Sequence, residues 1–391
     1  MNPQVDPRET MAQLPSLLQP FLTWLTGKAL PGQKPLFRHT PFTQLGTGLL
    51  MLFGGAAISF ALAAAGAWFW LLMPLSMIVT VAGARFLQSN IYHQASHSRF
   101  TGKPSRENPS GASRFDHWLG ETISVLLFLA PMDKYRESHR KHHFDDFGSM
   151  NDPDFRFFRH FGFEPGAPMA ELRRALWLGL IRPWPHLTYL RARFEDNLLS
   201  GASWQRRLAI LAVHAGATLF AASSGHLIVF LIVWLAPITI GFQLSSLLQF
   251  LTEHVWLLQQ QPGETKLHFF SRMTLARFQG EAMPAPYTLA WFGWAARMLT
   301  GHLLWRVFVL QGPLVVHDYH HNDPLDAGWP SAIYSRQSQI DSGAKRYRDY
   351  AGIWGFRYSV ERSLEAIHHF PPQSDPSKLT SKEMRELYRV M

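Results

Sequence analysis

The sequence predicts an all-α integral membrane protein in which four transmembrane helices form two hairpins. No Asp, Glu, Lys or Arg occurs among the 46 residues from His39 to Ala84, or among the 45 residues from Leu208 to Thr252. One bilayer crossing takes about 20 residues, so each block accommodates two crossings joined by a tight turn. Three groups of closely spaced histidines outside these blocks predict a metal site at the membrane surface.

The distribution of charge predicts how the hairpins are oriented. The hairpins are expected at about 45–86 and 208–252, and the turns inside the two blocks carry no charge. All charged residues therefore lie on one side of the membrane. Because the formal net charge is +9, the positive-inside tendency places that side, with both termini, in the cytoplasm.

Length alone would suit two soluble domains, but the uncharged blocks favour a single membrane domain. We expect an N-terminal cytoplasmic or interfacial segment at 1–38, without a signal-peptide pattern, and a membrane domain at 39–334. A basic cytoplasmic segment follows at 335–391, where Thr380-Ser-Lys-Glu383 predicts the start of a final helix.

Composition excludes several classes of site. The chain has no cysteine, which excludes disulfides, iron–sulfur ligation, thiolate-bound haem and the usual cysteine-rich zinc sites. A basic chain can bind nucleic acid, but no recognition motif occurs, and a membrane surface already accounts for the positive charge.

The histidines recur at helical spacing. Two of the groups share the pattern His-x-x-His-His, in which ligands at i, i+3 and i+4 project from one helix face. The upstream group is a pair one turn apart, on the expected extension of the second membrane helix, and one more histidine emerges at the end of the second block. The candidate metal ligands are His93, His97, His139, His142, His143, His254, His317, His320 and His321.

This set of ligands suits two metal ions better than one. A mononuclear zinc site takes three or four ligands, and His93-Gln-Ala-Ser-His97 lacks the Glu that a zinc protease helix uses as base. Neutral imidazoles suit iron and leave positions open for dioxygen, although ligand type alone does not select the metal. Nearby carboxylates are candidates for accepting the second N–H of ligating histidines, namely Asp145, Asp152, Asp154, Glu253 and Asp318.

The order of the histidine groups behind apolar hairpins resembles the membrane fatty acid desaturase and hydroxylase superfamily, the histidine-box non-haem di-iron enzymes. The resemblance extends from His93 to His321 and implies that all eight box histidines bind metal. His254 matches an additional ligand found in several members. The implied fold is four membrane helices under a cytoplasmic helical cap that carries two iron ions, with no side chain outside the metal centre assigned to catalysis.

The chain departs from the family pattern at its last box. Asn322-Asp-Pro324 follows the final pair, where many acyl-lipid desaturases have an apolar residue, Phe and Pro. His368-His369-Phe-Pro371 looks like that ending, but Glu365 occupies the place of its upstream histidine. We therefore exclude His368 and His369 from the expected ligands.

The resemblance implies O2-dependent oxidation of a fatty acyl chain, with desaturation as the first expectation. Hydroxylation and decarboxylation to a terminal 1-alkene stay open, as does the choice of free acid, thioester or lipid-bound substrate. Because the chain contains no haem, flavin or ferredoxin module, electrons must come from a separate carrier, such as a ferredoxin with its reductase. No nucleic-acid partner is expected.

A non-enzymatic class also stays open: a membrane protein that binds or transports a metal through histidines. Transporters usually place their ligands within the spans. In this chain the two blocks hold only His214 and His226 in their interiors, and both are taken as structural.

Overall fold

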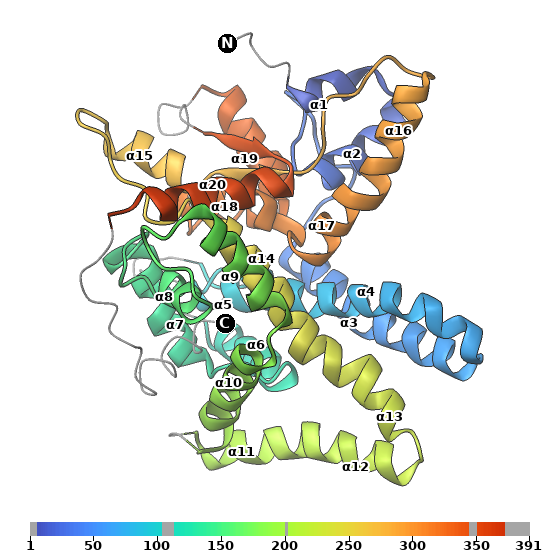
Figure 1. Ribbon diagram of the computed structural model, residues 1–391. Coiled ribbons are helices and arrows are strands. Elements are labelled where there is room, and N and C mark those ends of the chain that lie inside the picture. Colours follow the sequence, from blue (N-terminus) through green and yellow to red (C-terminus); the bar gives the residue numbers. More distant parts are fainter. Residues whose placement is uncertain (1–5, 104–112, 200–201, 344–349, 372–391) are drawn as a thin grey trace. The chain divides into compact units, whose positions relative to one another are not determined.

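The computed structural model of the chain describes residues 6–103, 113–199, 202–343 and 350–371, so the helix start expected at Thr380 lies outside the described residues. The chain folds into two compact units, which consist largely of helices (Figure 1). Unit 1 comprises Met1–Thr40 and Gln249–Ala366, and unit 2 comprises Pro41–Leu248 and Ile367–Met391. The segments expected at 1–38, 39–334 and 335–391 stay predictions.

Unit 2 begins with a pair of long helices. The first is α3 (Pro41–Ala64), and the second runs without interruption from Ala67 to Ser96. A Cβ at Gly83 would lie 2.1 Å from the backbone nitrogen of Leu52, so glycine permits the close approach of the two helices. A hydrogen bond of 2.7 Å between the hydroxyls of Ser59 and Ser76 also joins them. The apolar first block therefore forms two closely packed helices.

The second long helix changes its hydrogen-bonding pattern along its length. Its successive parts are η3 (Ala67–Leu72), α4 (Met73–Phe86), the π-helical η4 (Leu87–Tyr92) and α5 (His93–Ser96).

The remaining helices of unit 2 follow in chain order. They are α6 (Arg114–Leu126), α7 (Met132–Arg140), η5 (Lys141–Asp145), α8 (Pro153–His160), α9 (Met169–Ile181), α10 (Pro183–Phe194), η6 (Glu195–Leu199), α11 (Trp204–Ile210), η7 (Leu211–Ala215), α12 (Gly216–Ser223), α13 (Leu227–Phe230), η8 (Leu231–Leu235) and η9 (Pro237–Gly241). α14 (Phe242–Glu253) crosses the division between the units.

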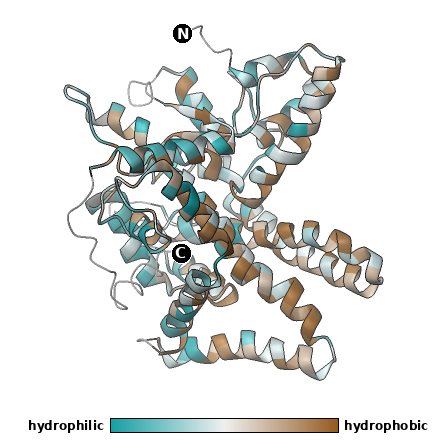
Figure 2. Ribbon diagram, in the orientation of Figure 1, coloured by the Kyte–Doolittle hydropathy of each residue, from teal (hydrophilic) through white to brown (hydrophobic). Residues whose placement is uncertain are grey.

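Three helices of the described chain are long and apolar enough to cross a membrane: Pro41–Ala64, Ala67–Ser96 and Leu227–Glu253. Figure 2 shows apolar residues along α3, α4 and α13, and many of them are exposed in the absence of lipid. The bent pair Leu289–Phe308 and Gly312–Asn322 would make a fourth span if it crosses as one. Trp204–Ser223, which begins the expected second hairpin, is helical but is not among these candidates. The two-hairpin plan with a cytoplasmic cap thus stays a prediction.

Unit 1 contains short helices and one small parallel sheet. Its strands β1 (Ala276–Phe278) and β2 (Gly352–Trp354) pair in parallel, with Arg277 opposite Ile353. Its helices are α1 (Pro7–Thr10), η1 (Met11–Gln13), η2 (Ser16–Leu18), α2 (Gln19–Thr26), α15 (Lys266–Met273), α16 (Leu289–Arg297), η10 (Met298–His302), α17 (Leu303–Phe308), η11 (Gly312–Val316), α18 (His317–Asn322), η12 (Trp329–Ser331), α19 (Ala332–Asp341) and α20 (Phe356–His369), the last of which extends into unit 2.

The N-terminal segment packs into unit 1. Its apolar side chains join those of α16 and η10 in one buried cluster, formed by Met11, Leu22, Leu25, Met283, Trp294 and Met298. The Arg306 guanidinium donates to the carbonyl oxygens of Trp24 and Gly312, at 2.7 and 2.9 Å. Residues 6–40 are therefore integrated into the unit that carries the last histidine group.

Candidate metal centre

Unit 2 brings together four imidazoles from two of the three predicted groups. His93 lies in α5, His97 follows it, His139 lies in α7, and His143 lies in η5. One ring nitrogen from each of the four lies within 4.8 Å of the corresponding nitrogens of the others. We call these four residues the unit 2 cluster. It joins positions more than 40 residues apart in the sequence, as expected for a metal site.

The rings of the unit 2 cluster converge on a common point. The Nε2 atoms of His97 and His139 are 2.9 Å apart, and the ring planes of His97 and His143 are nearly perpendicular, at 88°. Tyr135 stacks on His139 with ring planes 7° apart, and its hydroxyl lies 3.3 Å from His93 Nδ1. This tyrosine helps to orient two of the four imidazoles.

Helical spacing explains only part of this arrangement, because His142 and His143 lie in the π-helical turn η5. A second π-helical turn, η4, directly precedes His93. Such turns are often found at functional sites, where the wider turn changes the direction in which side chains point. Here His139 and His143 contribute to the unit 2 cluster, whereas His142 groups with Asp152 and Asp154.

Asp152 fixes the orientation of His142. The two oxygens of this fully buried carboxylate lie 3.0 and 3.1 Å from His142 Nδ1. The same carboxylate accepts hydrogen bonds from the backbone N–H groups of Gly148 and Asp154, at 2.8 and 2.9 Å. With Nδ1–H donated to the aspartate, Nε2 of His142 keeps a lone pair for a metal. The prediction for Asp152 is confirmed by these contacts, whereas the side chain of Asp145 lies outside the described set.

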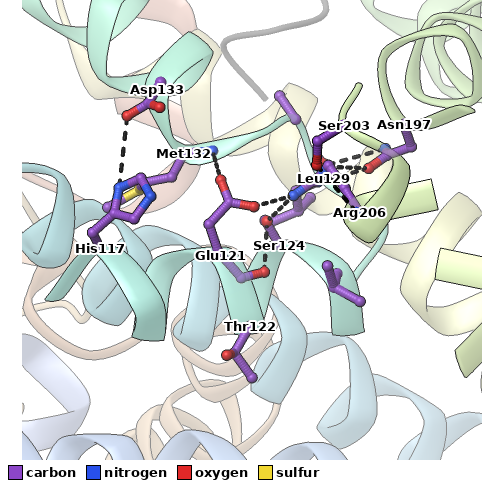
Figure 3. A network of polar contacts seen from close by, with 12 residues as sticks. His117, Glu121, Thr122, Ser124, Leu129, Met132, Asp133, Asn197, Ser203 and Arg206 are labelled. Atoms are coloured by element: carbon purple, nitrogen blue, oxygen red, sulfur yellow. Dashed lines mark hydrogen bonds and ion pairs between the residues drawn. The ribbon is translucent and has the colours of Figure 1, made fainter. Parts of the chain in front are cut away.

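A polar network holds the start of α7, the helix that carries His139 (Figure 3). Glu121 of α6 accepts the backbone N–H of Met132 at 2.6 Å and pairs with Arg206 of α11. Arg206 also donates to Leu129 O at 2.8 Å and to Asn197 Oδ1 at 2.6 Å. The loop before α7 is thereby tied to both α6 and α11.

Unit 1 holds a second group of buried imidazoles. His254 directly follows α14, and His317 and His321 lie one turn apart in α18; one ring nitrogen of each lies within 4.8 Å of the others. We call these three residues the unit 1 cluster. The Nε2 atoms of His317 and His321 are 3.0 Å apart, and the rings of His254 and His321 meet at 85°. His320 is buried in the same helix, but its ring nitrogens do not belong to the potential metal-binding group that contains these three histidines.

The carboxylates of unit 1 differ from each other in their contacts. Glu253 Oε1 lies 2.8 Å from His317 Nε2, as expected for a carboxylate beside a ligand. Asp318 instead pairs with Arg336, whose Nη2 lies 2.7 Å away, and accepts the Tyr319 N–H at 2.9 Å. The expectation that Asp318 would accept an imidazole N–H is therefore not met.

The histidines that were excluded from the site lie elsewhere in the described structure. His368 Nδ1 lies 2.9 Å from Ala167 O, and His214 Nε2 lies 2.8 Å from Val125 O. His226 is exposed at the turn before α13. None of the three, nor His369, belongs to a potential metal-binding group of the described residues.

Both clusters have the chemistry and spacing of metal sites. Burial and the neighbouring imidazoles hold the pKa of His139 well below its usual value, which keeps the ring neutral and able to bind a cation. Neighbouring ligand atoms around a six-coordinate ion with bonds of about 2.1 Å are about 3.0 Å apart. The Nε2 separations of 2.9 Å in unit 2 and 3.0 Å in unit 1 fit this spacing.

Three features of the site were not predicted from the sequence. They are the π-helical turns, the contacts of Tyr135 with two imidazoles, and the Glu121–Arg206 pair. The proximity of Tyr135 to His139, one helical turn away, is a sequence signal that was available for the second of these.

Comparison with known proteins adds one finding. A family model described as fatty acid desaturase matches residues 68–276, which is more than half of the chain. The matched stretch contains the whole unit 2 cluster, together with His142 and His254. A comparison with curated proteins finds no match.

Proposed function

Because the chain belongs to the fatty acid desaturase family, we propose that it is a membrane non-haem di-iron oxidoreductase that desaturates a fatty acyl chain. The observation that carries the proposal is the unit 2 cluster, in which four imidazoles from the first two histidine boxes converge inside the matched region. Neutral imidazole ligands with open coordination positions suit iron that reacts with O2.

Each unit supplies ligands for one ion. His93, His97, His139 and His143 would hold one iron, and His254, His317 and His321 would hold the other. His142 and His320 are proposed as further ligands. Bound iron would supply the O2 chemistry that removes hydrogen from an unactivated methylene.

The protein's own groups position the reaction. Asp152 holds His142 in one tautomer, Tyr135 orients His93 and His139, and the Glu121–Arg206 pair fixes the loop before α7. Geometry of this kind decides which methylene is attacked. In the overall reaction, one O2 takes two hydrogen atoms from the acyl chain and two electrons and two protons from outside, giving a double bond and two waters.

The electrons are proposed to come from a separate carrier, such as a ferredoxin with its reductase. With all charged residues expected on the cytoplasmic side and a formal net charge of +9, that face would attract an acidic carrier. The substrate is a fatty acid, acyl thioester or lipid-bound acyl chain in the bilayer.

The proposal is tested by incubating the iron-loaded protein in liposomes with uniformly deuterated fatty acids or their thioesters, a reductase system and O2. Mass spectrometry should show a product that has lost two deuterium atoms. A product that gains one oxygen would indicate hydroxylation, and a 1-alkene that is one carbon shorter would indicate decarboxylation. Absence of any oxidised product from iron-loaded protein would contradict the proposal.

Two histidine variants control this experiment. His139→Ala removes a member of the unit 2 cluster and is expected to lower turnover below detection, because the iron loses a ligand. His368→Ala changes a histidine outside the potential metal-binding groups and should retain wild-type turnover. Equal activity of the two variants would reject the ligand assignment.

A further inference from the structure

Two buried arginines of unit 2, Arg85 of α4 and Arg193 of α10, lie against the same aromatic ring. Their guanidinium carbons are 4.8 and 4.6 Å from the centroid of the Phe242 ring. Arg85 is 0 % exposed and Arg193 is 1 % exposed. Two positive charges are therefore held near each other in the interior of unit 2.

The surroundings of Arg193 do not satisfy its charge. Its Nη1 makes one long contact, 3.5 Å to Ile238 O, and its Nε and Nη2 have no hydrogen-bond partner among the described residues. Tyr189 attracts the guanidinium, but no carboxylate of the described residues is among the groups that act on it. Burial raises the pKa of Tyr189, so its hydroxyl carries no negative charge at neutral pH. A buried cation without an anion is costly, and a bound anion relieves that cost.

Two other buried arginines show how such a charge is usually satisfied. Arg206 pairs with the carboxylate of Glu121. Arg306 donates to three backbone carbonyl oxygens. Arg193 has no such set of partners in the part of the chain that the structure describes.

We propose that Arg193, together with Arg85, binds the carboxylate of a free fatty acid, and that the substrate is therefore the acid itself. This inference rests on the proposed function and deepens it, because it selects one of the three substrate forms named there. A guanidinium binds a carboxylate through two parallel N–H···O bonds. Nε and Nη2 of Arg193, the two nitrogens without a partner, are suited to donate such a pair.

The burial of the two arginines favours a small anion. A carboxylate is attached directly to the acyl chain and is smaller than a phosphate group. The phosphates of an acyl-coenzyme A thioester belong to a nucleotide, which is too large for a site whose two cations are at most 1 % exposed. A methyl ester would bring no charge to the site.

The position of Arg85 relates this site to the unit 2 cluster. Arg85 lies eight residues before His93 in the continuous helix Ala67–Ser96, which is about 12 Å along the helix axis. Residues 80–96 of this helix are all buried, so the distance runs through the interior of unit 2. A carboxylate held at Arg85 would therefore place a methylene well along the chain beside the cluster, which favours desaturation over loss of the carboxyl carbon.

The alternative role of the two arginines is to join α4 and α10 by packing on Phe242. The two roles predict different changes in binding. A packing role weakens the binding of charged and uncharged acyl chains alike, whereas a carboxylate site distinguishes them.

The test measures the binding of tritiated hexadecanoic acid, its methyl ester and its coenzyme A thioester to the iron-loaded, full-length protein in detergent. The wild type should bind the acid at least about tenfold more tightly than the ester or the thioester. Arg193→Gln should weaken binding of the acid by about 10- to 100-fold, because it removes a charged, two-bond contact, and should leave ester binding unchanged.

Arg191→Gln is the matched control, because Arg191 lies in the same helix and is paired with Glu195 at the exposed surface. It should bind all three compounds as the wild type does. Retention of the preference for the acid in Arg193→Gln, equal weakening for acid and ester, or tighter binding of the thioester than of the acid by the wild type would each overturn the inference.

A second measurement uses the wild type alone and applies even if Arg193→Gln does not fold. The acid is labelled with ¹³C at its carboxyl carbon, and the NMR signal of the bound molecule is followed as a function of pH. Two guanidinium groups should lower the pKa of the bound carboxyl below its value in detergent micelles. The same pKa in both environments would overturn the inference.

These outcomes separate the inference from the proposed function. A wild type that oxidises acyl chains, together with an unchanged preference for the acid in Arg193→Gln, would refute the carboxylate site alone. A wild type with no oxidised product, together with the predicted loss of acid binding in Arg193→Gln, would refute the desaturase proposal and retain the carboxylate site.

Discussion

At the scale of single residues, the two carboxylates beside the histidines behave differently. The carboxylate of Asp152 holds His142, the backbone of Gly148 and the start of α8, so its charge is used within the protein. Within the described residues, Glu253 Oε2 has no hydrogen-bond partner. Similar residue types at similar positions along the chain therefore have different roles, and the difference depends on which donors the fold brings near.

Asp152→Asn is expected to lower iron affinity by about 10- to 100-fold, because the amide no longer fixes the protonated Nδ1 of His142 as strongly. Iron titration of the metal-free protein measures this. Asp133→Asn is the control, since Asp133 lies in α7 and its carboxylate is exposed. Equal iron affinity of the two variants would show that Asp152 does not support a ligand.

The residue-scale features show where sequence reasoning succeeded. The spacing of His139 and His143 and of His317 and His321 predicted that each pair would lie on one helix face, and the ring nitrogens of each pair do lie within 4.8 Å of each other. It did not predict that His142 would separate from His139 and His143, because a π-helical turn adds a residue to the local repeat. Local propensity does not encode such a turn, which depends on what packs around it.

At the scale of elements, α7 depends on partners that are distant in sequence. Glu121 and Arg206 are 85 residues apart, yet together they hold the loop that leads into the helix carrying His139 (Figure 3). No spacing rule relates positions so far apart, so the sequence offered no signal for this pair. Three of the four expected membrane helices, by contrast, could be predicted, because span length is a property of one continuous segment.

Arg206→Met is expected to lower the free energy of unfolding by about 2–3 kcal/mol, because it leaves Glu121 and two backbone or side-chain acceptors without their donor. Thermal or denaturant unfolding in bicelles measures the change. Arg207→Met is the matched control, since Arg207 is exposed in the same helix.

A double-mutant cycle with Glu121→Gln tests the pair itself. The two substitutions should be strongly non-additive, because each one already removes the shared interaction. Additive effects would mean that the Glu121–Arg206 contact contributes nothing to the stability of unit 2.

At the scale of the whole molecule, the distribution of charge predicts one orientation in the membrane. The absence of cysteine from the wild-type chain makes this testable, because a single introduced cysteine is the only site for a maleimide label. Ser224→Cys lies at the exposed turn before α13, and Ser342→Cys lies at the exposed end of α19.

A membrane-impermeant maleimide added to intact cells should label Ser224→Cys and should label Ser342→Cys only after the membrane is opened. This follows because the turn at Ser224 carries no charge, whereas Ser342 lies in a basic segment expected in the cytoplasm. The reverse pattern of labelling would place the metal clusters on the outer face and contradict the proposed orientation.

The metal content of the purified, full-length protein tests the central claim most directly. Elemental analysis after expression with all transition metals available should give about two irons per chain, one for each cluster of the proposed di-iron enzyme. It should fall to about one in His139→Ala or His321→Ala, since each substitution disrupts one cluster. Stoichiometric zinc in place of iron, or iron content unaffected by both substitutions, would contradict the account.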